Sequence, residues 1–116
     1  MIPRDVEADA LTVLAPLGVP VSTRVPNPRP AAHVRVQRAG GTGTNLVQER
    51  PLLLVECWGA SSVDAFELAA RAYGLLDAAF CSPGNRPSSP VSNPDPHTSS
   101  VRYQFTVSPI VNLKES

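Results

Sequence analysis

The chain is poor in the residues that small enzymes and metal proteins use most. Its 116 residues include two cysteines and two histidines. The spacing of Cys57 and Cys81 fits neither a metal site nor a disulfide framework. We therefore interpret both as small apolar core residues of a protein in a reducing compartment. His33 and His97 have no cysteine or carboxylate near them at ligand spacing. We therefore expect neither a metal nor a cofactor.

The chain also lacks an excess of charge and any long apolar run. Ten basic and ten acidic residues give a formal net charge of zero, which excludes the broad basic field of most nucleic-acid-binding domains. Lysine occurs once, at Lys114, and the preference for arginine fits bidentate recognition of phosphate or carboxylate, or a codon bias. No apolar run approaches the ~20 residues that span a bilayer. Residues 1–17 carry acids and no unbroken apolar core, so we expect no signal peptide and a soluble protein in the cytoplasm.

The strongest apolar signal lies in the middle of the chain. Residues 52–55 form a continuous apolar run, closed by Cys57, Trp58 and Gly59, and this run predicts a strand covered on both faces. On strand spacing Leu53 and Val55 share one face, whereas Glu56 and Trp58 lie on the other.

A helix is predicted directly after this strand. Ser61 and Asp64 have the spacing of a capping box, in which the hydroxyl accepts a hydrogen bond from a backbone N–H group of the first turn. Six residues then recur at spacings of three and four and predict the buried stripe of the helix: Phe66, Ala69, Ala70, Tyr73, Leu76 and Phe80.

The remaining elements are shorter. Residues 3–14 predict a short helix that ends at Pro16. Alternation of apolar and polar residues predicts strands over residues 19–25, 32–37 and 101–107, and the proline within the first of these favours an outer strand.

Two stretches predict loops. Residues 40–46 begin GGTGTN and predict a flexible hairpin loop; they do not form a phosphate-binding loop, because no lysine follows and the next element is a strand. Residues 82–100 are dominated by proline, serine, glycine and asparagine, and such a long loop suggests function or disorder.

Together these elements predict an α+β fold in a single domain over residues 1–116, a small mostly antiparallel β-sheet with two α-helices packed on one face. The residues expected in the structural core are Leu53, Val55, Trp58, Phe66, Tyr73, Leu76, Tyr103 and Phe105.

Glu56 is the one carboxylate embedded in an apolar strand. Burial could raise its pKa enough for acid/base work, or it could pair with an arginine of a neighbouring strand such as Arg35 or Arg102. His33, Arg35 and Gln37 share one strand face, which is either solvated or in contact with a neighbouring subunit. No serine stands in a G-x-S-x-G turn, and we expect no catalytic residue and no enzyme.

Several motifs resemble those of the tail terminator proteins of tailed bacteriophages, especially siphophages that infect actinobacteria. They are the proline run at residues 26–30 with the segment 34–41, the V-E-C-W-G of residues 55–59, and the D-P-x-x-x-x-x-R-Y-x-F-T-V of residues 95–107. The resemblance covers residues 19–107.

The resemblance implies a structural virion protein at the head-proximal end of the tail, assembled in the host cytoplasm. Such a subunit forms a ring, usually a hexamer, which stops polymerisation of the major tail tube protein and offers a surface to the head-completion and connector proteins. Genome DNA would pass through the lumen without specific binding, which suits a near-neutral subunit because strong attraction to phosphates would hold the genome back. No membrane is implied.

The chain departs from this family between residues 80 and 95, where related chains carry an extra strand and only Val91 is apolar here. A reduced or irregular last hairpin is therefore expected. The hypothesis for the subunit and tube interface names Arg24, Arg29, His33, Arg35, Gln37, Arg38, Gly40, Gly41, Thr42, Gly43, Asn45, Arg86 and Arg102.

Two other functions stay open from the sequence. One is a different head-to-tail connector or neck protein. The other is a small cytoplasmic ligand-binding domain or enzyme that uses Glu56, His33 and the glycine loop, and it predicts a concave pocket beside Glu56.

Overall fold

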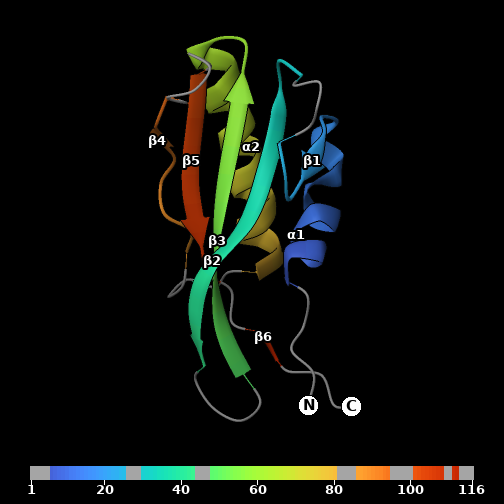
Figure 1. Ribbon diagram of the computed structural model, residues 1–116, viewed down its shortest axis with the longest axis vertical. Helices are drawn as coiled ribbons and strands as arrows, with labels where there is room; N and C mark the ends of the chain where they lie inside the picture. Colours follow the sequence, from blue (N-terminus) through green and yellow to red (C-terminus); the bar gives the residue numbers. More distant parts are fainter. Residues whose placement is uncertain are drawn as a thin grey trace.

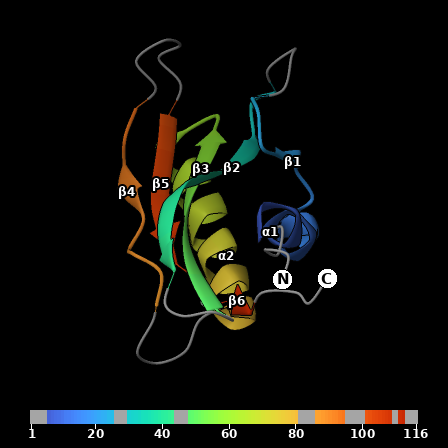
Figure 2. The same ribbon diagram turned by 60° about the horizontal axis from the view of Figure 1, so that its bottom comes forward.

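The computed structural model describes residues 6–25, 30–43, 48–80, 86–94, 101–108 and 111–112. They form two layers, a sheet and a pair of α-helices packed on one of its faces (Figure 1; Figure 2). The predicted α+β fold with a mostly antiparallel sheet is confirmed. In chain order the elements are α1 (Val6–Leu14), the 3-10 helix η1 (Ala15–Leu17), β1 (Val21–Ser22), β2 (His33–Gly43), β3 (Gln48–Gly59), α2 (Ser62–Phe80), β4 (Val91–Ser92), β5 (Val101–Val107) and β6 (Val111–Asn112).

The strands lie in the order β1-β2-β3-β5-β4, and β6 pairs with the other end of β3. The central strands β2, β3 and β5 are antiparallel, and β5 has the bounds that its alternation predicts. β1 lies at the edge, as predicted, but it pairs parallel to β2 and only over Val21 and Ser22. The Val34 N–H group continues this contact by donating to the carbonyl oxygen of Pro20 at 2.9 Å.

The predicted loop at residues 40–46 is wrong at its start, because Gly40–Gly43 belong to β2. Gly40 lies opposite Leu52 of β3 and Gly43 lies opposite Glu49, after an irregularity just before Gly40. The ladder between two strands uses backbone groups alone, so a glycine run can extend a strand once the partner strand is in place. In Figure 1 the paired ends of β2 and β3 continue past the helices.

The predicted loop at residues 82–100 contains a short strand. In β4, Val91 lies opposite Gln104 and Ser92 opposite Tyr103. A plain loop was the wrong prediction for these two residues, whereas the expectation of a reduced last hairpin is confirmed.

Helix α1 buries one face against the sheet and α2. Val6, Ala10 and Leu14 are buried, Val13 is half-buried, and η1 adds Leu17. Gly18 then takes the left-handed conformation with φ of 74°, which glycine adopts at low cost and which ends the helical segment.

Helix α2 starts with the predicted cap. The Asp64 N–H group donates to Oγ of Ser61 at 3.1 Å. Gly59 makes the sharp turn from β3 possible, because a Cβ there would lie 2.5 Å from the Ala65 backbone nitrogen. This turn brings the first helical residues directly onto the sheet.

The buried stripe of α2 differs from the predicted one by a rotation about the helix axis. Leu76 and Ala69 are buried as expected, but Phe66 is 48% exposed and Ala70 is exposed as well. Small alanines let the helix approach the sheet closely. The Phe66 ring lies at the edge of the contact between α2 and the sheet, with its centroid 5.5 Å from that of the Tyr103 ring in a T-shaped arrangement. The buried residues of α2 are Ala65, Leu68, Ala69, Ala72 and Leu76.

The core between the layers contains most of the expected residues. Leu53, Val55, Leu76 and Phe105 are buried in it, and Tyr73 and Tyr103 pack against it half-buried. Phe66 was the wrong choice for the core, for the reason given above. Trp58 is buried, but it belongs to the opposite face of the sheet and not to this core.

Candidate functional site

The face of β2, β3 and β5 that points away from α1 and α2 is here called the open face. Among the described residues, no helix lies on it (Figure 2). Side chains alternate along each strand, so those next in sequence to the core positions point to the open face. The strand register sets them in three cross-strand rows: His33, Trp58 and Arg102; Arg35, Glu56 and Gln104; Gln37, Leu54 and Thr106.

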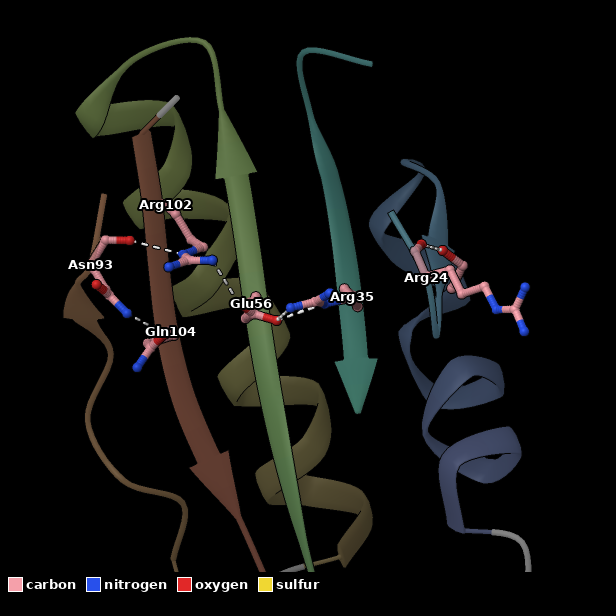
Figure 3. A network of polar contacts seen from close by, with 7 residues as sticks. Arg24, Arg35, Glu56, Asn93, Arg102 and Gln104 are labelled. Carbon is pink, nitrogen blue, oxygen red and sulfur yellow. Dashed lines mark hydrogen bonds and ion pairs between the residues drawn. The ribbon is translucent and has the colours of Figure 1, made fainter. Parts of the chain in front are cut away.

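Glu56 is the centre of the open face. One carboxylate oxygen, Oε1, accepts hydrogen bonds from Nε and Nη2 of Arg35, the former at 2.7 Å. The other, Oε2, accepts from Nη1 of Arg102 at 2.8 Å (Figure 3). The predicted pairing of Glu56 with Arg35 or Arg102 is confirmed, and the carboxylate holds both arginines at once. Charge-assisted bonds to both oxygens allow a charged side chain that is only 3% exposed.

Trp58 forms the aromatic part of the cluster. Its ring stacks on His33 with centroids 4.4 Å apart and planes 11° apart. The guanidinium carbons of Arg35 and Arg102 lie 5.9 Å and 5.5 Å from its ring centroid, within cation–π range. The open face is therefore a packed, ordered surface at this end of the sheet.

His33 lies on the strand face that it was predicted to share with Arg35 and Gln37, but at His33 this face is not solvated. The side chain is fully buried in its stack with Trp58. Nδ1 lies 3.1 Å from the Pro30 carbonyl oxygen, which can only accept, so Nδ1 carries the proton in this contact. His33 thus supports the Trp58 ring and does not face solvent.

The segment around β4 ties into the same network. Nε of Arg102 donates to the Asn93 carbonyl oxygen at 2.8 Å, and the Asn93 side-chain amide donates to Oε1 of Gln104 at 2.7 Å (Figure 3). Arg102 therefore connects Glu56 of β3 to the segment beyond β4.

The hydrogen bonding leaves Glu56 without a free oxygen for acid/base work. Two hollows lie elsewhere: one of about 310 Å³ and one of about 180 Å³, both lined by Arg71 of α2 and neither by Glu56 or His33. Arg71 donates to the carbonyl oxygens of Pro16 and Leu17 at 3.5 and 3.4 Å. The pocket that a ligand-binding domain would need beside Glu56 is not one of these hollows.

The neighbouring thiol of Cys57 is buried. Cys57 points into the core, and burial raises the pKa of its thiol to about 12, with a further contribution from the charge of Glu56. The neutral thiol is therefore the stable form near pH 7. Within the described part of the chain, no group of three histidine, cysteine or acidic side chains could hold a metal ion. No helix there is long and apolar enough to cross a membrane.

The other predicted interface residues are scattered. Arg24 is exposed at the end of β1 and points away from the cluster in Figure 3. Arg86 pairs with Asp77 of α2 at 2.7 Å, and this bond raises the pKa of Arg86. Gln37 and Arg38 are exposed on β2, and the Arg38 N–H group donates to a carboxylate oxygen of Glu7 at 3.1 Å.

The glycine part of the predicted interface is strand backbone. Gly40, Gly41, Thr42 and Gly43 belong to β2 and pair with β3. Arg29 and Asn45 lie outside the described residues.

Comparison with known proteins finds no family model that matches the chain and no matching curated protein sequence.

Two residues of the cluster, Gln104 and Asn93, were not expected near Glu56, and Trp58 was placed on the face of Glu56 but was expected in the core. Alternation alone places Gln104 on the face of Arg102, so Gln104 could have been assigned to the cluster. Asn93 gave no such signal, because its place depends on the pairing of the two-residue strand β4.

Proposed function

We propose that this chain is a tail terminator: a structural protein that caps the tail tube of a bacteriophage as a ring and forms the joint to the head-completion proteins. The proposal rests on the motif resemblance within residues 19–107, and the open face is the structural observation that supports it most. His33, Glu56 and Trp58 are buried within this face, whereas exposed Gln37 and half-buried Leu54 and Thr106 leave its other end available for contact with other proteins.

The open face has the properties of a preorganised protein contact. Arg35 and Arg102 are held by Glu56 and by the Trp58 ring, so little side-chain entropy is left to lose when a partner binds. Arginine is also among the residues that contribute most at protein interfaces, and Arg35 and Arg102 keep part of their side chains exposed. The cluster carries two arginines against one carboxylate, which is too little positive charge for strong DNA binding. A protein partner, such as another subunit, the tail tube protein or a head-completion protein, fits this chemistry better than the genome does.

A small ligand-binding domain or enzyme has less support. Both oxygens of Glu56 are occupied, and His33 is buried against Trp58. The two side chains that such a function would use, Glu56 and His33, are therefore already engaged in contacts within the fold.

The decisive experiment is electron microscopy of phage particles made without this protein. A terminator is identified by overlong tails that lack heads, because tube polymerisation then has no stop. Tails of normal length that fail to join heads would instead identify a neck protein and contradict the proposal.

A surface variant sharpens this test. Reversal of Arg35 is unsuitable, because Glu56 would then face a second carboxylate in a buried site. Gln37→Glu changes an exposed side chain of the open face, and Thr12→Glu on the exposed side of α1 is the matched control. We expect the first variant to cap tails poorly and the second to cap them normally.

A further inference from the structure

The open face keeps an unused part of its hydrogen-bonding capacity. Arg35 and Arg102 side chains are 27% and 13% exposed, and within the described residues no hydrogen bond uses Nη1 of Arg35 or Nη2 of Arg102. Beside them lie exposed Gln37 and half-buried Leu54 and Thr106. This part of the open face, which we call the sheet patch, combines guanidinium donors with a small apolar area.

The complementary chemistry lies on the other side of the same subunit. The surface of α2 that points away from the core carries several small or apolar residues, with Val63 65% exposed and Ala70, Gly74 and Ala78 exposed after it, and it also carries the exposed charged residues Asp64 and Arg71. Glu67 lies among them, exposed, and within the described residues it makes no ion pair. We call this surface the helix patch.

We propose that the sheet patch of one subunit binds the helix patch of a second copy of this chain, with the Glu67 carboxylate of that copy completing the Arg35 and Arg102 cluster. Within the described residues, Arg35 and Arg102 of the sheet patch keep unbonded N–H groups, and Glu67 of the helix patch makes no ion pair although Arg71 lies one turn along the same side of α2. Short side chains on α2 let its backbone come close to the flat sheet, and Leu54 then packs against Val63 or the alanines. Of the two other acids of α2, half-buried Asp77 is already paired with Arg86, whereas Asp64 is exposed in the first turn.

The position of the two patches dictates the kind of assembly. They lie on opposite sides of a two-layer subunit, so each copy offers a different patch to each neighbour (Figure 2). Such a head-to-tail contact repeats from subunit to subunit and closes into a ring when the rotation permits. The inference rests on the proposed ring and assigns the two surfaces that would form it.

Sedimentation of the full chain tests this contact. We expect the wild-type chain to associate as its concentration rises into the millimolar range. Glu67→Arg spoils the helix patch and Gln37→Glu spoils the sheet patch, both at exposed positions, and we expect each to weaken association at least about tenfold. Thr12→Glu on α1 should associate like the wild type.

A mixture of the two variants gives the sharpest result. Glu67→Arg keeps an intact sheet patch and Gln37→Glu an intact helix patch, so an equimolar mixture should form pairs that stop at two subunits. A wild-type chain that stays monomeric throughout, a Glu67→Arg variant that associates like the wild type, or a mixture that does not pair would each overturn the inference.

If particles without the protein have overlong tails while Glu67→Arg still caps them normally, the terminator function stands and this interface is wrong. If the contact forms but particles without the protein have tails of normal length, the interface stands and the function is wrong.

Discussion

Replacing Glu56 by glutamine tests whether the charge cluster holds the open face together. Glutamine has nearly the same volume, so Glu56→Gln removes the charge and leaves the packing in place. It keeps one carbonyl acceptor, but its NH2 group then faces a guanidinium that also only donates. Arg35 and Arg102 would be left facing each other across β3 without the carboxylate between them.

The structure sets the size of the expected loss. Removal of one member of a buried ion pair costs about 3–5 kcal/mol in free energy of unfolding. Glu56 is almost fully buried, but Arg35 and Arg102 keep 27% and 13% of their side-chain surface in contact with solvent. Water therefore screens the two stranded cations in part, and we expect the lower end, about 3 kcal/mol. For a chain of this length that corresponds to a fall in Tm of roughly 10 °C.

Urea denaturation at neutral pH measures this loss. Glu67→Gln removes an exposed carboxylate of the same type and should change the free energy of unfolding by no more than about 0.5 kcal/mol. A second variant in which Arg35, Glu56 and Arg102 are all replaced by apolar residues of similar volume should recover most of the stability, because no buried charge is left alone. The reasoning fails if Glu56→Gln unfolds at the same urea concentration as Glu67→Gln.

Three further outcomes are expected from urea denaturation. Gly59→Ala should lower the free energy of unfolding by about 1–3 kcal/mol, because its Cβ would overlap the α2 backbone. Gly74→Ala, where a Cβ would meet nothing within 4 Å, should raise it by about 0.5–1 kcal/mol, and equal effects of the two variants would show that the turn at Gly59 can relax. Ser61→Ala removes the N-cap of α2 and should lower the free energy of unfolding by about 1 kcal/mol, and Ser62→Ala should lower it less. The reverse order would show that Ser61 is not the N-cap. The pKa of Cys57 rises from 9.0 to about 12 on folding, so above pH 9.0 the unfolded chain releases a proton that the folded chain keeps. Stability should therefore fall more steeply between pH 9.0 and 12 in the wild type than in Cys57→Ala, and parallel curves would refute this cause.

Features that depend on neighbours in sequence were predictable from sequence. The alternation over residues 101–107 sets the bounds of β5, and the spacing of Ser61 and Asp64 sets the start of α2. The pairing of Glu56 with arginine was also predictable, because a carboxylate in an apolar strand needs a cation and strand periodicity limits the choice of partner. These rules act within a few residues or across one strand pair.

Features that depend on how elements meet were decided by the tertiary structure alone. The rotation of α2 follows from close approach of its alanines to the sheet, which left Phe66 at the edge although its spacing fits a buried stripe. Gly40–Gly43 became strand because β3 supplies a backbone partner, and His33 became buried because the register places it beside Trp58. Periodicity states which face a side chain is on, but only the register between strands distant in sequence states which side chains stand next to each other there. That register is why an apparently wet strand face became a packed cluster of arginine, glutamate, histidine and tryptophan.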